Sequence, residues 1–521
     1  MLSPSEHARK DTLDKDLDKF VSVEEAAGVV SRGLVAPGLA LLFIALAAAG
    51  TSIYVAGQPG AIVIIAAAAI GGYMALNIGA NDVANNVSAA VGARALTIGS
   101  ALVMAAVFET AGALIAGGDV VETISKGIID PSAVADSNTF VRLMLGALLA
   151  SALWVNLATW IGAPVSTTHA VVGAVLGAGI ASAGLGSVDW GVMSAIAASW
   201  VISPLAGALI AALFLFFIKS TIIYQDDKVT AARRWVPLLI GIMAGSFTAY
   251  LASKGLGRLM HVGGATLALL GFGSTAVFWA IAHRYVAIQS RGMENRNQSL
   301  RKLFRVPLVI SAALLSFAHG ANDVANAVGP LAAIVSAAQS GNVDAAVGIP
   351  LWVMLIGAIG ISIGLLLYGP KLIRMVGEQI TKLNPMRAFC VALSAALTVI
   401  VASALGMPVS STHIAVGAVF GVGFFREWYT AKSPRRRAYL ERKMATRRAE
   451  REALSGPVTD VLADEADLDE PRIPPVSRDE IARRNLVRRA HVRTIVTAWI
   501  TTVPASAALS IAAFYAIGIV F

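Results

Sequence analysis

Two short polar phrases each occur twice in this chain, and both carry residues that can bind ions. The first phrase is Gly-Ala-Asn-Asp-Val-Ala-Asn, at residues 79–85 and again at 320–326. The second is Pro-Val-Ser-(Thr/Ser)-Thr-His, at residues 164–169 and again at 408–413. The order of the phrases is the same both times and their spacing is nearly so. The chain therefore consists of two homologous halves, each with both phrases.

The first phrase places a carboxylate among amides at the end of an apolar run. The side chains are Asn81, Asp82 and Asn85 in the first half, and Asn322, Asp323 and Asn326 in the second. Their spacing allows all three to share one side of a helix. A membrane-buried Asp costs roughly 2.5–3.5 kcal/mol on insertion scales, so two at matching places need partners. We expect a cation-binding site; the structural alternative is a pair of helix-capping aspartates.

The second phrase sets hydroxyl groups directly after a proline. They belong to Ser166, Thr167 and Thr168 in the first half, and to Ser410, Ser411 and Thr412 in the second. Proline is favoured at the first position of a helix, so we expect Pro164 and Pro408 to begin helices. A helix start offers unpaired N–H groups and the positive end of the dipole, which attract anions. An ordinary N-cap is the structural alternative, but the duplication favours an anion site.

The composition places both halves in a membrane. Of the 521 residues, 56% are hydrophobic and only 14% charged, whereas soluble domains are about 25% charged. Lipid cannot satisfy an open sheet edge, so the fold class predicted is an all-α polytopic membrane protein with about 11 to 13 membrane segments. The predicted spans are 36–55, 61–78, 97–117, 140–161, 190–218, 236–253, 265–283, 305–318, 346–369, 388–405 and 494–521, with two Gly/Ala-rich stretches at 165–183 and 409–425.

The charged residues predict how the chain is oriented. Residues 1–34 lack the apolar core of a secretory signal and are expected to form a cytoplasmic tail. Seventeen basic and twelve acidic residues lie in 426–493, which we interpret as a basic cytoplasmic insertion that sets the topology. Anionic membrane lipid and a regulator are alternative partners for it, and nucleic acid is not expected as one. The single cysteine, Cys390, excludes an intrachain disulfide and a thiolate metal cluster.

The loops after the two Pro-Val-Ser phrases differ, which predicts that the halves are inverted relative to each other. The loop in the first half is short and has no basic residue, whereas its counterpart is the basic insertion. Inverted repeats are typical of secondary transporters, with the site at the midplane. The predicted organisation is a first repeat at 35–218, a connecting region with two transmembrane helices at 219–304, a second repeat at 305–425, the insertion, and a final helix of the second repeat at 494–521.

The doubled phrases resemble those of the inorganic phosphate transporter (PiT) family of phosphate symporters, in a bacterial-type member. Further similarity lies in Phe317-Ala318-His319 and in Val120-Val121-Glu122-Thr123-Ile124. The resemblance implies phosphate import coupled to sodium or protons, re-entrant helical hairpins, a homodimer and a location in the bacterial inner membrane. It places the coupling-ion ligands on the Asn and Asp residues of the first phrase and the phosphate ligands on the hydroxyls of the second.

The charges explain why coupling is needed. Phosphate is an anion and its expected site holds Asp82 and Asp323, so cations or protons must accompany it. Oxygen ligands suit sodium at these two residues, whereas a proton-coupled mechanism would keep one Asp protonated. The family places a further acidic residue at Glu109. His169, His319 and His413 are candidate proton relays, with local hydrogen bonding as the alternative for each.

Three other functions are alternatives. A sulfate permease of the same fold would differ only in substrate, but sulfate has no proton to donate to Asp, which favours phosphate. A membrane enzyme is disfavoured because the sequence shows no nucleophile and base pair, no metal-ligand spacing and no glycine-rich phosphate loop, so neither catalytic residues nor a resident cofactor is predicted. A passive anion channel is disfavoured because buried acids would obstruct anions.

Overall fold

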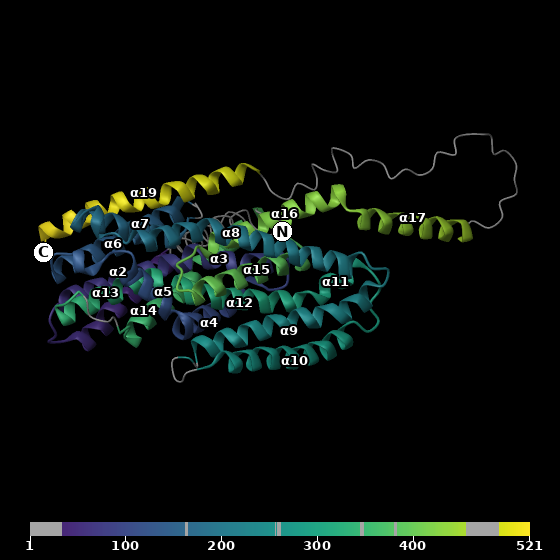
Figure 1. The fold of residues 1–521 in the computed structure, drawn as a ribbon, viewed down its shortest axis with the longest axis horizontal. Helices are drawn as coiled ribbons and strands as arrows, with labels where there is room; N and C mark the ends of the chain where they lie inside the picture. Colours follow the sequence, from purple (N-terminus) through teal and green to yellow (C-terminus); the bar gives the residue numbers. More distant parts are fainter. Residues whose placement is uncertain are drawn as a thin grey trace, which may run out of the picture.

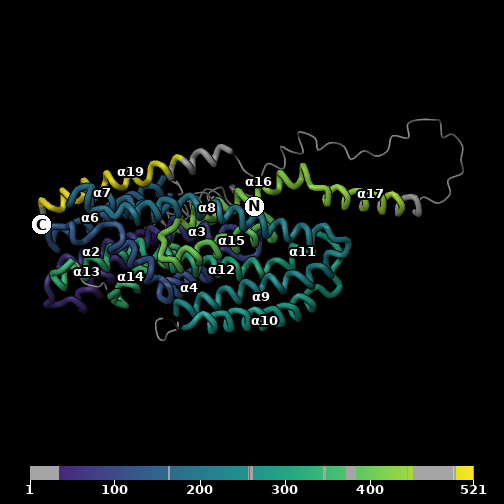
Figure 2. Tube along the Cα trace, viewed as in Figure 1, coloured from purple at the N-terminus to yellow at the C-terminus, as the bar shows by residue number. Residues whose placement is uncertain are grey.

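The computed structural model describes residues 34–161, 165–255, 257, 262–343, 348–379, 383–454 and 489–520. These residues form helices, eleven of which are long and apolar enough to cross a membrane. Figure 1 shows most of them running side by side along the long axis of the molecule, and Figure 2 follows the chain through the same bundle. The all-α polytopic architecture predicted from the composition is confirmed. The tail before residue 34 and residues 455–488 of the insertion lie outside the described part.

The helices agree closely with the predicted spans. After a first helix at Leu34–Val55, the bounds are α2 Ala61–Asn81, α3 Val83–Gly92, α4 Ile98–Ala116, α5 Gly118–Glu122, α6 Ser137–Ile161, α7 Thr167–Ala183, α8 Trp190–Ile218, α9 Lys228–Lys254, α10 Gly264–Gln289, α11 Asn297–Leu303, α12 Arg305–Asp323, α13 Ala325–Ser340, α14 Leu351–Gln379, α15 Pro385–Ala404, α16 Ser411–Lys432, α17 Pro434–Leu454 and α19 Arg489–Val520. A π-helical turn, Thr123–Gly127, follows α5. The expected boundary at residue 425 therefore falls inside α16, which runs on into the insertion.

Both copies of the first phrase lie at an interruption of a membrane helix. The first break is at Asp82, between α2 and α3, and the second at Val324, between α12 and α13. The backbone stays near the α-region at both residues, and the Asn85 N–H bonds to the Asp82 carbonyl at 3.0 Å, three residues back instead of four. Each break tightens the helix by a local turn without ending the span. Asn81 and Asn85 therefore lie on either side of a local interruption at Asp82, where the backbone stays in the α-region.

Both copies of the second phrase lie where a helix pair turns back on itself. Helices α6 and α7 make one hairpin, and α15 and α16 make the other. The expectation that Pro408 begins a helix is wrong. Residues 407–410 are not helical, and α16 begins only at Ser411 with Ser410 as its N-cap. The helix begins after Ser410 because the Ser410 hydroxyl accepts the N–H of His413 at 3.2 Å, which satisfies a donor of the first turn. Pro164 lies outside the described residues.

Glycines bring the helices of the two halves into close contact. A Cβ atom added at Gly79 in α2 would overlap the carbonyl oxygen of Ile361 in α14. The matching glycine of the second half, Gly320 in α12, meets the carbonyl of Glu109 in α4 in the same way. Each phrase-bearing helix therefore packs against a helix of the opposite half. This packing between the halves holds both helix breaks in the middle of the bundle.

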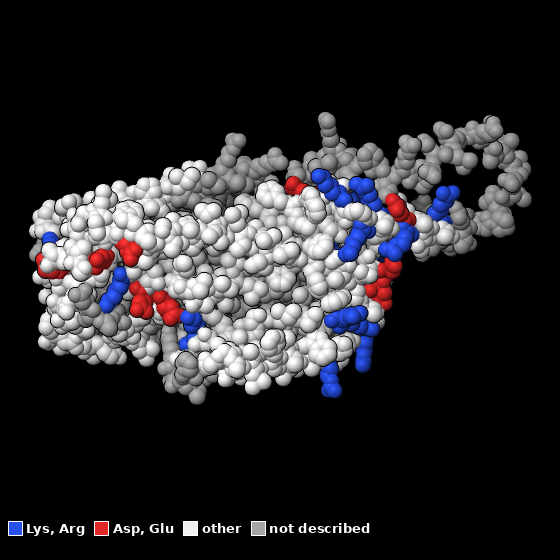
Figure 3. All heavy atoms as spheres, in the orientation of Figure 1, with Lys and Arg blue, Asp and Glu red and all other residues white. Residues whose placement is uncertain are grey.

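Charged residues mark the two ends of the bundle. Figure 3 shows lysine and arginine gathered at the end formed by α11, α17 and the loops beside them, separated by a broad uncharged band from a smaller charged group at the other end. Helices α9 and α10 pack together along one edge, and α10 is almost entirely uncovered by protein. An uncharged band with exposed apolar side chains is what a helical bundle presents to hydrocarbon.

Candidate functional site

The Asp82 carboxylate joins the two hairpins. Its Oδ2 accepts the hydroxyl of Thr167, on the first hairpin, at 2.7 Å, and its Oδ1 accepts the hydroxyl of Thr412, on the second, at 3.1 Å. Asp82 is 2% exposed. A buried carboxylate requires donors of this kind, and here they come from segments more than 200 residues apart in the chain. The site residues predicted from the two phrases thus meet at one point.

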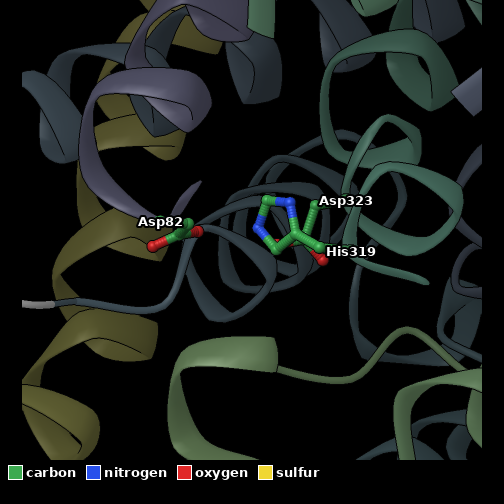
Figure 4. A group of neighbouring side chains, drawn as sticks. All are labelled: Asp82, His319 and Asp323. Atoms are coloured by element: carbon green, nitrogen blue, oxygen red, sulfur yellow. The ribbon is translucent and has the colours of Figure 1, made fainter. Parts of the chain in front are cut away.

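The Asp323 carboxylate has fewer partners. Its Oδ2 accepts the hydroxyl of Ser411 at 3.2 Å and lies 2.9 Å from Nε2 of His319. Its Oδ1 is buried and has no hydrogen-bond donor among the described residues. One ligand atom each from Asp82, His319 and Asp323 lies within 4.8 Å of the others. Figure 4 shows the ring of His319 lying between the two carboxylates.

The amides of the first phrase tie the interrupted helices to the hairpins. Asn81 donates to Thr159 at the end of α6 at 2.8 Å, and its counterpart Asn322 donates to Ser403 at the end of α15 at 3.0 Å. Asn326 donates to the hydroxyls of both Thr167 and Thr168, each at 3.2 Å. All of these bonds use the amide NH₂ groups. The side-chain amide oxygens (Oδ1) of Asn81 and Asn326 are buried and have no hydrogen-bond donor among the described residues.

The two hairpin tips contact each other directly. The hydroxyl of Thr168 donates to the backbone carbonyl of Val409 at 3.1 Å, and Asn85 donates to Thr412 at 2.9 Å. Ser166 has a local role like that of Ser410, because its hydroxyl caps α7 by accepting the N–H of His169 at 3.1 Å. Four of the six predicted hydroxyls therefore lie in the central network, and the two serines cap the helices that carry them.

Glu109 and His319 extend the site into α4. The Oε2 atom of Glu109 lies 2.7 Å from Nδ1 of His319, and its Oε1 accepts the amide of Asn86 at 2.9 Å. Both side chains of the Glu109–His319 pair are fully buried. Both carboxylate oxygens of Glu109 therefore have side-chain partners.

His169 and His413 lie apart from the carboxylates. Their ring centroids lie 4.5 Å apart with the rings edge to face, and the ring centroids of His169 and Trp200 lie 3.9 Å apart. The Trp200 indole donates to the carbonyl of Pro408 at 3.3 Å. This aromatic cluster joins both hairpins to α8. Of the three histidines predicted as relays, His319 lies between two acids, Glu109 and Asp323.

Several residues of the network were not predicted. Asn86, Thr159 and Ser403 hold predicted residues in place, and Thr123 donates to the carbonyl of Gly406 at 2.7 Å, beside the second hairpin. Asn86 had a signal, since it follows the phrase directly. Thr159 and Ser403 had none, because a lone hydroxyl in an apolar helix more often bonds its own backbone.

A cavity of about 410 Å³ opens next to the turn of the second hairpin. Glu122, Thr123, Gly406 and Met407 contribute to its wall. Asp119 also lines it and is paired with Lys254, at the end of α9, at 2.6 Å. Because the Met407 carbonyl accepts from Asn322 at 3.1 Å, the cavity is only one residue layer from the network.

Known proteins share this architecture and sequence. Residues 78–510 match the phosphate transporter family. A phosphate permease of Helicobacter pylori strain J99 is 45% identical over 95% of this chain and 98% of its own length, and one of Pyrococcus abyssi is 40% identical over 68% of this chain and 86% of its own. A solved structure of a sodium-dependent phosphate transporter is 32% identical, covers 88% of this chain and 100% of its own, and superposes with a TM-score of 0.74. The chain belongs to the phosphate transporter family and is a multi-pass membrane protein.

Proposed function

We propose that this protein is a symporter that imports inorganic phosphate together with sodium. The observation that carries the proposal is that hydroxyls of both hairpins meet on the Asp82 carboxylate. In this arrangement the starts of α7 and α16 converge, and each contributes first-turn N–H groups and a positive dipole end. An oxyanion bound between them would be shared by both halves.

Phosphate fits the network better than sulfate does. A hydroxyl group both donates and accepts, so Thr167 and Thr412 can turn from Asp82 to a phosphate oxygen by rotation of their hydroxyl hydrogens. Hydrogen phosphate keeps a proton that it can donate to a nearby carboxylate, whereas sulfate at neutral pH has none. A carboxylate facing sulfate would therefore be left in like-charge contact.

The acidic residues supply the reason for cation coupling. Two unit charges 4.8 Å apart repel by about 3.5 kcal/mol at an effective dielectric constant of about 20, and a phosphate adds further negative charge. Sodium prefers oxygen ligands, and the unpartnered oxygens of Asn81, Asp323 and Asn326 are of that kind. Support also comes from the similar solved structure, which belongs to a transporter that depends on sodium. Sodium bound by Asp82 and Asp323 would travel with phosphate as a second substrate.

The transport path is proposed from the charges at the two ends. The basic end, which carries α11 and α17, faces the cytoplasm by the positive-inside rule. The cavity beside Gly406 is lined by Asp119, whose partner Lys254 ends α9, whereas Lys228, Arg233 and Arg234 lie at the other end of that helix. We assign it as the outer vestibule. Inversion of the two halves would let the same hairpin movement open the site toward either side.

The test is uptake of labelled phosphate into proteoliposomes that contain the purified protein. We expect uptake to require an inward sodium gradient, to be inhibited by arsenate and to be little affected by sulfate. Equal uptake driven by a proton gradient in sodium-free buffer would show that the coupling ion is the proton and not sodium. Uptake of sulfate in preference to phosphate, or no phosphate uptake under any gradient, would refute the proposed function.

A further inference from the structure

The environment of His319 is present in only one of the two halves. The residue before the glycine of the first phrase is Ile78 in the first half and His319 in the second. Gly320 packs on the carbonyl of Glu109, and Gly79 packs on that of Ile361, so Ile361 stands where the other half has Glu109. Glu109 and His319 are therefore matched by two isoleucines. A repeat that needed only a symmetric pair of sodium sites would not require this difference.

Glu109 fixes the orientation and the tautomer of His319. Their contact at 2.7 Å involves Nδ1, and Glu109 is held in turn by the amide of Asn86 at 2.9 Å. With Nδ1 facing the Glu109 carboxylate, Nε2 points to the other side of the ring and can bind a metal when it carries no proton. A carboxylate behind one ring nitrogen is the usual support for a histidine that binds a metal through the other.

Atoms able to bind a metal converge on the free side of His319. Its Nε2 lies 2.9 Å from Oδ2 of Asp323 but makes no hydrogen bond of acceptable geometry, and Oδ1 of Asp323 has no donor among the described residues. Asp82 completes a set whose ligand atoms lie within 4.8 Å of one another. All three residues are at least 98% buried. Unsatisfied nitrogen and oxygen atoms at this depth require an electropositive partner.

We propose that Asp82, His319 and Asp323 form a binding site for one divalent transition-metal ion, of the zinc and cobalt class. One imidazole and two carboxylates are a ligand set for such an ion, whereas sodium and magnesium favour oxygen alone. Metal–ligand distances of about 2.0–2.2 Å place neighbouring ligands about 3.4 Å apart in a tetrahedral site, so a pair at the 4.8 Å limit must draw closer by about 1.4 Å. The ion's two charges balance the two carboxylates.

The site has a consequence for transport that rests on the proposed function. A divalent ion on Asp82 and Asp323 occupies the carboxylates assigned to the coupling cation. It therefore competes with sodium and inhibits phosphate uptake. Binding itself does not depend on transport, so it is measurable on the protein in detergent.

The experiment is a titration of the purified, metal-free protein with Co²⁺, after removal of any affinity tag. We expect visible ligand-field absorption that saturates at one Co²⁺ per chain and is displaced by Zn²⁺. His319→Gln should weaken binding at least 100-fold, and Glu109→Gln about 10- to 100-fold, because it removes only the supporting carboxylate. His169→Gln is the matched control, since the ring of that buried histidine packs against Trp200 and His413 and is not one of the proposed ligands, and it should bind Co²⁺ as the parent protein does.

The outcomes separate the two proposals. No stoichiometric Co²⁺ binding by the parent protein overturns the metal site, as does unchanged binding in His319→Gln and Glu109→Gln. If one variant fails to fold, as judged by its thermal unfolding, the other and the parent titration still decide. In proteoliposomes, Zn²⁺ inhibition that rising sodium relieves supports the competition. Absence of phosphate uptake in the parent protein would overturn the proposed function and leave the binding result standing.

Discussion

The hydroxyl oxygens of Thr110 and Ser362 lie 2.8 Å apart where α4 meets α14. Ser362 stands 252 positions after Thr110, the same spacing that separates Gly112 from Gly364, so the two residues are equivalents in the two halves. A contact between equivalents is expected on a local two-fold axis. His169 and His413, also equivalents, meet in the same way. These pairs agree with a two-fold relation between the halves, which the proposed inversion requires.

The first prediction concerns the two aspartates. We expect Asp82→Asn and Asp323→Asn each to abolish sodium-driven phosphate uptake, because each removes a negative ligand of the coupling cation. Asn keeps the size of the side chain, so the protein should still reach the membrane. Uptake in proteoliposomes is the measurement. Asp226→Asn, which changes an exposed acid outside both the network and the cavity, is the control and should retain uptake. Near-normal uptake in both network variants would contradict the assignment.

The sequence was sufficient to predict the spans and the pairing of the two phrases because each leaves a periodic or repeated signal. Long apolar runs define the helices, and a duplicated polar phrase in such a run has few structural explanations. The prediction that Pro408 begins a helix was wrong for a local reason. Ser410, two residues later, caps the helix and satisfies its first turn better than proline does. Whether a helix begins at one or the other depends on backbone angles that composition does not specify.

The partners within the site could not be predicted. Nothing in the sequence says that Thr167 bonds Asp82 while Ser411 bonds Asp323, because these contacts depend on how the hairpins dock. The Glu109–His319 pair is also a tertiary contact, across 210 positions. A lone acid and a lone histidine in two apolar helices each have local explanations. Only the close glycine packing between α4 and α12 brings them together.

The second prediction concerns the hydroxyls that meet on Asp82. Thr167→Val and Thr412→Val keep the shape of the side chain and remove its donor. Each should lower the apparent affinity for phosphate about 10- to 100-fold, because a hydrogen bond to a charged group contributes about 1.5–3 kcal/mol. The concentration dependence of uptake measures this. Thr248→Val is the control, since that hydroxyl bonds only the carbonyl of Ala244 in its own helix. An unchanged affinity in both hairpin variants would remove them from the phosphate site.

The third prediction concerns the glycines that join the halves. Gly320→Ala places a methyl group on the carbonyl of Glu109, and Gly79→Ala places one on that of Ile361. Each should destabilise the protein by about 1–3 kcal/mol, the usual result of overpacking. Gly273→Ala is the control because it meets open space and gains helix propensity of up to about 1 kcal/mol. Thermal unfolding in detergent should therefore give lower midpoints for Gly320→Ala and Gly79→Ala than for Gly273→Ala. Equal midpoints would show that the packed helices can move apart to accept a methyl group without loss of stability.

The fourth prediction concerns the anchor of the second hairpin. Gly406 has a φ of 68°, and its carbonyl accepts the hydroxyl of Thr123 at 2.7 Å, beside the cavity. Thr123→Val removes this bond without adding volume, so the turn at 405–410 should exchange its amide hydrogens faster. Gly406→Ala strains the turn by about 1–2 kcal/mol and should act in the same direction. Hydrogen exchange followed by mass spectrometry measures both. The hairpin carries Ser411 and Thr412 into the carboxylate network, so faster exchange should accompany weaker phosphate binding. If Thr123→Val weakens phosphate binding without changing exchange in the turn, Thr123 is instead a direct contact of the substrate.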